Sequence, residues 1–127
     1  MFEVGVVSRF SAEHALTGDF GAATEKHGHD YRVEVAARGA RLRQDGTLCD
    51  IALLKSELDA AVAELEGADL NSVPGIAVLN TTAEAVAHHL FERVAPAVTH
   101  EGVHAVIVKV WESEDSYASF EGTLGEI

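Results

Sequence analysis

The sequence predicts an α+β domain in which a four-stranded antiparallel sheet carries two helices on one face. Three observations lead to this fold class. Segments with strand-like alternation stand in pairs at both ends of the chain, two segments with helical periodicity lie between them, and each strand pair is joined as a hairpin. Hairpin strands pair antiparallel, and helices placed between two hairpins pack on one side of the sheet. The predicted order is strand, strand, helix, helix, strand, strand.

Residues 2 to 14 and 29 to 39 form the first predicted pair of strands. Alternate side chains of a strand point to opposite faces, so one face of the first strand carries Phe2, Val4, Val6, Phe10, Ala12 and His14. In the second strand, one face carries Tyr31, Val33, Val35 and Ala37, and the other carries Arg32, Glu34, Ala36 and Arg38. Such a pattern indicates a sheet with one buried face and one wetter face.

Two helices and two further strands follow. The first helix is expected from Ile51 to Glu66 with Asp50 as N-cap, and the second from Thr82 to Ala97 with Thr81 or Thr82 near its cap. The β-branched stretch "HEGVHAVIVKVWES" predicts the third strand, and "YASFEG" predicts the fourth. Because the third strand is apolar on both faces, we expect its outer face to meet another subunit or another layer of the structure.

Composition and charge narrow the class of protein. The chain has 127 residues and no internal repeat, which predicts one domain over residues 1–127. A net charge of −12 disfavours nucleic-acid and anionic-membrane partners, because a field of that sign repels phosphates. No apolar run is long enough for a membrane span, and there is no signal-peptide pattern. With Cys49 as the single cysteine, a cytoplasmic location is expected.

The stretch "EKHGHDY" contains the first candidate for chemistry. On a strand, His27 and His29 point to the same side, and Gly28 leaves space between them. His14 ends the neighbouring strand and completes a set of three imidazoles, the usual ligand set of a catalytic zinc with an open fourth position. Incidental histidines are the alternative reading of so short a motif. The spacing assigns no role to the other histidines, His88, His89, His100 and His104.

The segments "RFSAEHAL", "HGHDYRVEV", "GTLCDIALLKSELD", "NTTAEAVAHHLF" and "VIVKVWESED" together resemble the 6-pyruvoyltetrahydropterin synthase and 6-carboxytetrahydropterin synthase family. The resemblance runs in order from about Val7 to Gly122. It implies a T-fold: a four-stranded antiparallel sheet with two helices on one face. Three such sheets close into a barrel and two trimers stack into a homohexamer, with active sites at subunit interfaces.

The resemblance also implies roles for individual residues. His14, His27 and His29 match the family's zinc ligands, and Glu112 matches the glutamate that anchors the pterin ring. A carboxylate suits that anchor, because it accepts two parallel hydrogen bonds from the 2-amino group and the ring N–H. Thr82 matches a threonine of the pterin pocket, and it serves equally well as a helix N-cap.

Two departures from the family pattern concern catalysis. The family has a cysteine shortly before H-G-H, but the chain reads "DFGAATEK" there and its only cysteine is Cys49. The family's Asp-His pair after the first helix is matched by Glu66 and Gly67. General acid–base steps need groups within hydrogen-bond reach, so we expect the usual reaction on dihydroneopterin triphosphate to be absent or very weak.

Three functions stay open on these residues. The first is a pterin-binding or purine-binding homologue without the usual synthase reaction. The second is an active zinc-dependent pterin side-chain lyase with Glu25 as its base, since some family members use a glutamate in place of the cysteine. The third is a structural or regulatory oligomer. Zinc occupancy also stays open, because without a base the three histidines can serve as hydrogen-bonding pocket residues.

Overall fold

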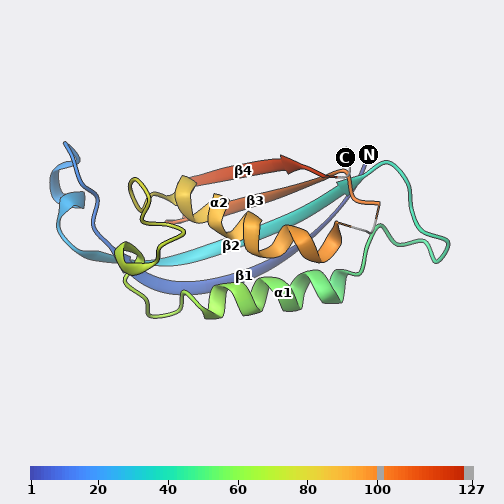
Figure 1. The fold of residues 1–127 in the computed structure, drawn as a ribbon, viewed down its shortest axis with the longest axis horizontal. Coiled ribbons are helices and arrows are strands. Elements are labelled where there is room, and N and C mark those ends of the chain that lie inside the picture. Colours follow the sequence, from blue (N-terminus) through green and yellow to red (C-terminus); the bar gives the residue numbers. More distant parts are fainter. Residues whose placement is uncertain (100–101, 125–127) are drawn as a thin grey trace.

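A computed structural model describes residues 1–99 and 102–124 of the chain. Its elements follow the predicted order (Figure 1): β1 (Phe2–His14), β2 (His27–Gly39), α1 (Ile51–Ala63), α2 (Ala83–Val94), β3 (Ala105–Trp111) and β4 (Tyr117–Thr123). Short 3-10 turns stand at Gly21–Thr24, Leu70–Ser72 and Ala95–Val98. The prediction for His100 lies outside the described residues.

The four strands form one antiparallel sheet in the order β1-β2-β3-β4. Phe2 pairs with Gly39 at one end of the first hairpin, and His14 pairs with His27 at the other. Both helices lie on the same side of this sheet (Figure 1), α1 against β1 and α2 against β3 and β4. The predicted α+β fold, with two helices on one face, is therefore confirmed.

The helix-covered face of the sheet carries the core. Its strand residues are the alternating apolar set predicted from the sequence, joined by one stripe from each helix: Val6, Phe10, Tyr31, Val33, Val35, Leu54, Leu58, Val86, Leu90, Val106, Val108 and Val110. Phe2 departs from the predicted stripe. It is 47% exposed.

Several boundaries differ from the prediction by a few residues. Strand β2 begins at His27 rather than at residue 29, so both histidines of the H-G-H motif lie inside the sheet. Helix α1 ends at Ala63 rather than Glu66, and α2 ends at Val94, after which Ala95–Val98 forms a 3-10 turn. Pro96 accounts for the second difference, because its ring cannot continue an α-helix.

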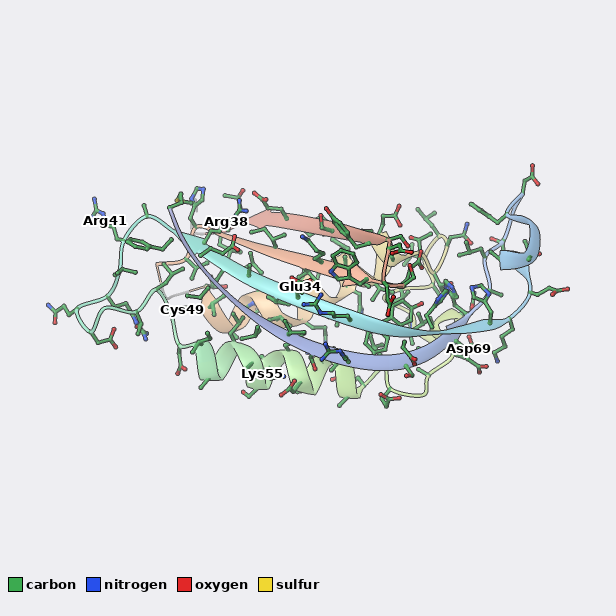
Figure 2. The ribbon with its side chains drawn as sticks, turned by 180° about the vertical axis from the view of Figure 1, so that it is seen from behind. Glu34, Arg38, Arg41, Cys49, Lys55 and Asp69 are labelled. Atoms are coloured by element: carbon green, nitrogen blue, oxygen red, sulfur yellow. The ribbon has the colours of Figure 1, made fainter. Side chains whose placement is uncertain are left out.

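The other face of the sheet carries charged side chains. Figure 2 shows this face, with Glu34 on the middle of β2. The Glu34 carboxylate accepts a hydrogen bond from Trp111 Nε1 at 2.6 Å and pairs with Arg32 at 3.2 Å. Within the described residues, no helix is long and apolar enough to cross a membrane.

Candidate metal and ligand site

The three predicted metal ligands meet where β1 and β2 end. His14 is buried, with 2% of its surface exposed, whereas His27 and His29 are half-buried. One nitrogen of each imidazole lies within 4.8 Å of a nitrogen of both others. Ligand nitrogens around a tetrahedral zinc are separated by roughly 3.4 Å, given Zn–N bonds of about 2.1 Å. The triad is therefore close to the spacing that a metal ion needs.

Backbone carbonyls fix two of the rings. His14 Nδ1 lies 2.7 Å from the Thr81 carbonyl oxygen, and His27 Nδ1 lies 2.7 Å from the Glu25 carbonyl oxygen. A carbonyl only accepts hydrogen bonds, so each Nδ1 carries the proton and each Nε2 keeps a lone pair. The two Nε2 atoms are 3.0 Å apart. Two lone pairs at this distance repel unless a proton or a cation lies between them, so the donor set fits a metal ion.

Burial and charge both act on His14. Burial lowers the pKa of His14, the hydrogen bond to Thr81 partly offsets this effect, and the neighbouring His27 and His29 lower the pKa further. A low pKa keeps the imidazole neutral, which is the form that binds metal. Glu112 acts in the opposite direction and raises the pKa of His14, so its carboxylate lies within electrostatic reach of the triad.

Glu112 lies directly after β3, at the same end of the sheet. The register of β2 and β3 pairs Arg32 with Trp111, and one further step places Tyr31 opposite Glu112. Burial, and then the charge of Glu112, raise the pKa of Tyr31, so the phenol stays neutral. Its ring stacks on Phe10 with centroids 4.7 Å apart, and its buried hydroxyl has no hydrogen-bond partner among the described residues.

An open cavity of about 910 Å³ adjoins this end of the sheet. Tyr31, His29 and Glu112 line it together with residues from β1, β2, the end of β3 and the segment after α1: Arg9, Ser11, Asp30, Arg32, Glu66, Trp111, Ser113 and Glu114. The cavity is large enough for a bicyclic heterocycle, and it brings one of the three histidines and the predicted anchor glutamate to a common space.

The two threonines before α2 have different positions. Thr82 is the N-cap, with its hydroxyl accepting a hydrogen bond from the Ala85 N–H at 3.2 Å. Thr81 is 1% exposed and contacts His14 through both its carbonyl oxygen and its hydroxyl. The sequence reading assigned Thr81 only to the cap. No local signal in the sequence distinguishes it, because Thr81 and Thr82 are adjacent and either could cap the helix.

Glu25 lies just outside β2. Its backbone is extended, with φ −88° and ψ 145°, and its side chain is exposed. The carbonyl oxygen that orients His27 is the contact that ties Glu25 to the triad. The adjacent Lys26 points to the other side of the strand, where its ammonium pairs with Asp69 at 3.2 Å. The Lys26 ammonium therefore points toward Asp69 and away from the histidines, because adjacent side chains of an extended chain point to opposite sides.

Glu66 and Gly67 run along the free edge of β1. Gly67 donates its N–H to the Ser11 carbonyl at 2.7 Å, and a Glu66 carboxylate oxygen accepts the Ser11 N–H at 3.3 Å. Gly67 has φ +71°, a left-handed conformation that favours glycine. A histidine introduced at this position would therefore be strained, although no atom would lie within 4 Å of its Cβ.

Two further histidines, His88 and His89, lie on α2. His88 is exposed on α2, packs edge-on against Phe120 and lies 3.5 Å from Glu92. His89 is half-buried, and its Nδ1 would lie 2.6 Å from a Cβ on Gly75. Cys49 is buried, as predicted, and Figure 2 shows it at the end of the molecule opposite Asp69.

A single-layer antiparallel sheet, two helices on one face and three imidazoles at the end of the first hairpin define a T-fold protein with a histidine site that can bind metal. The family model "6-pyruvoyl tetrahydropterin synthase" matches residues 3–123. The chain belongs to this family.

Individual relatives agree with the family match. The chain is 27% identical to "6-pyruvoyl tetrahydrobiopterin synthase" of Dictyostelium discoideum, over 89% of this chain and 90% of that one. It is similar in fold to the Caenorhabditis elegans 6-pyruvoyl tetrahydropterin synthase (TM-score 0.80, 24% identity, 96% of each chain). A Plasmodium vivax 6-pyruvoyltetrahydropterin synthase has the same fold (TM-score 0.80, 19% identity, 97% of this chain and 98% of that one).

Proposed function

We propose that this protein binds a zinc ion through His14, His27 and His29 and a pterin-like or purine-like heterocycle through Glu112. The observation that carries the proposal is the pair of Nε2 lone pairs that meet 3.0 Å apart while both Nδ1 atoms face carbonyl oxygens. A bound zinc would supply a Lewis acid at the open position of this site. Backbone carbonyls already orient two of the three residues that would hold it, His14 and His27.

Glu112 supports the second half of the proposal. No hydrogen bond or ion pair satisfies its half-buried side chain within the described residues, and its charge reaches both His14 and Tyr31. A free carboxylate beside a neutral phenol and an open cavity can accept the 2-amino group and ring N–H of a pterin in a bidentate pair. We propose Thr82 as a further ligand contact at the start of α2, where its hydroxyl accepts the Ala85 N–H as N-cap.

The usual synthase reaction is not part of the proposal. Cys49 is buried in the core, and "DFGAATEK" offers no thiol before the first histidine of the motif. Gly67 has no side chain with which to move a proton. We therefore propose binding, or altered chemistry on a related ligand, in a cytoplasmic homohexamer built as a dimer of trimers, with residues 1–127 as one domain.

A second candidate is a zinc-dependent pterin side-chain lyase with Glu25 as base. In the Plasmodium vivax relative, a glutamate is a catalytic residue, and structures exist with alanine or cysteine in its place. Glu25 is the acidic residue nearest to the H-G-H motif on its N-terminal side, and its side chain is solvent-accessible. Cleavage of the dihydroneopterin side chain, lost in Glu25→Gln, would establish this candidate over binding alone.

The test of the proposed function is binding by the zinc-loaded protein. Zinc content is measured by elemental analysis, and neopterin and deazaguanine compounds are titrated by calorimetry. Glu112→Gln keeps the shape of the side chain and removes its charge, so affinity is expected to fall roughly 10-fold or more, the range for hydrogen bonds to a charged group. Glu92→Gln removes the charge of an exposed glutamate on α2 that does not line the cavity, and this variant should bind like wild type.

Two results would contradict the proposal. Absence of zinc from protein purified without chelator and offered zinc afterwards would remove the metal site. Equal affinity of wild type and Glu112→Gln for every heterocycle would remove Glu112 as the anchor.

A further inference from the structure

The backbone that leaves the metal site is held by two asparagine side chains. After His14 pairs with His27, β1 has no further strand partner. The side-chain amide of Asn71 makes two hydrogen bonds to the backbone of Ala15: Oδ1 accepts the Ala15 N–H at 2.8 Å, and Nδ2 donates to the Ala15 carbonyl at 3.0 Å. A side-chain amide thus replaces the missing neighbouring strand, since it offers one acceptor and one donor to the same residue.

Asn80 repeats this arrangement two residues farther along. Its Oδ1 accepts the Thr17 N–H at 2.8 Å and the Thr17 hydroxyl at 3.0 Å, and its Nδ2 donates to the Thr17 carbonyl at 3.0 Å. The two asparagines come from the connection between α1 and α2, far from Ala15 and Thr17 in sequence. We call this set of contacts (Asn71 with Ala15, Asn80 with Thr17) the amide clamp.

The amide clamp adjoins the hydrogen bond that orients His14. Thr81 directly follows Asn80, and its carbonyl lies 2.7 Å from His14 Nδ1. The residue before Thr81, Asn80, is therefore hydrogen-bonded to the segment that follows His14, at Thr17. Both chain segments that form the Thr81–His14 contact are joined by the clamp. Without the clamp, the contacts of Thr81 would have to hold the two loops in register against their conformational freedom: its carbonyl and hydroxyl with His14, and a long hydrogen bond of 3.5 Å from its hydroxyl to the Ala15 carbonyl.

We propose that Asn80, assisted by Asn71, is a positioning residue for the metal site: it keeps the Thr81 carbonyl against His14 Nδ1 and so directs His14 Nε2 at the metal. This inference rests on the proposed metal site. Groups that orient the ligands of a metal act through ligand geometry, and their loss typically costs about 10-fold to 100-fold in metal affinity. Asn80 acts one step farther out, so the lower end of that range is expected.

The experiment compares Asn80→Ala and Asn80→Asp with wild type. The aspartate keeps an acceptor for the Thr17 N–H but cannot donate to the Thr17 carbonyl, so its effect is expected to be smaller. Zinc affinity is measured by competition with a chelator, and the visible spectrum of the cobalt-substituted protein reports ligand geometry. Asn80→Ala should weaken zinc binding about tenfold and alter the cobalt bands.

A control separates positioning from general stability. Asp50 caps α1 by accepting the Leu53 N–H at 3.0 Å, and it adjoins Cys49, which lies at the end of the molecule opposite Asp69 (Figure 2). Asp50→Ala should lower the unfolding temperature and leave zinc affinity unchanged. Equal zinc affinity in Asn80→Ala and wild type, or an equal loss in Asp50→Ala, would overturn the inference.

A readout without metal distinguishes failure of the inference from failure of the proposed function. In the metal-free protein, the His14 Nδ1–H should give a protected proton resonance, identified by its absence in His14→Gln. Asn80→Ala should broaden or remove this resonance. If wild type binds no zinc but the resonance depends on Asn80, the proposed function fails and the positioning role stands. If Asn80→Ala keeps the resonance, the positioning role is wrong. If Asn80→Ala does not fold, the same measurement is made on Asn71→Ala, and a retained resonance there overturns the inference.

Discussion

Strand β2 and helix α2 each carry a pair of histidines that are close in sequence, but only the pair on the strand converges in space. In the hairpin, His27 and His29 are two apart on a strand and their rings meet at 4.8 Å between centroids. On α2, His88 and His89 are adjacent, and a helix turns adjacent residues about a quarter-turn or more apart. One faces Phe120 and the other faces Gly75. Convergence thus depends on the period of the element and not on the number of histidines.

The largest expected difference between the two groups is in metal binding. His29→Ala removes one of three ligands and should weaken zinc affinity more than about 100-fold, beyond the range expected for outer partners. His88→Ala removes an exposed imidazole and should bind zinc like wild type. Chelator competition measures both. Similar zinc affinities in the two variants would mean that the hairpin histidines are not the metal site.

A second difference concerns unpaired polar groups. Tyr31 carries a buried hydroxyl with no partner in the described part of the chain, whereas Tyr117 is 51% exposed. Leaving a buried hydroxyl unpaired costs about 1–3 kcal/mol. We therefore expect Tyr31→Phe to raise the free energy of unfolding of the ligand-free protein by about 1 kcal/mol, and Tyr117→Phe to leave it unchanged. Urea denaturation measures both, and a destabilised Tyr31→Phe would show that the hydroxyl already has a partner.

Much of the site was predictable because strands impose a simple rule. Alternation placed His27, His29 and Tyr31 on one face, and the hairpin then brought His14 beside His27. The role of Thr81 was not predictable, because nothing local to "NTTAE" says which threonine meets His14 across the molecule. The amide clamp was hidden for the same reason. Asn71 lies in the short 3-10 turn Leu70–Ser72 and Asn80 in the loop before α2, where no sustained periodicity specifies the direction of a side chain.

The residue at which α1 ends was also not predictable from the apolar pattern. The apolar pattern of α1 continues through Leu65, which is buried, although the helix ends at Ala63. A turn at Gly67 with φ +71° redirects the chain onto the edge of β1, where Gly67 bonds to Ser11. The apolar periodicity of a sequence predicts which residues are buried. Tertiary contacts such as that of Gly67 with Ser11 determine where the helix ends.

The smallest expected effect is a difference between His89 and His88 in how they contribute to the pH dependence of stability. Burial, and then the charge of Arg93, lower the pKa of His89 below 6.5, although Glu64 and Glu92 raise it. Well above pH 6.5, the imidazole is neutral in both the folded and the unfolded chain, so its contribution to stability is constant. As the pH falls below 6.5, the unfolded chain takes up the proton first, and the free energy of unfolding decreases until the folded pKa is passed. His89→Gln should therefore flatten the pH dependence of urea denaturation below pH 6.5, relative to His88→Gln. An unchanged slope would mean that the ring against Gly75 is as well solvated as an exposed one.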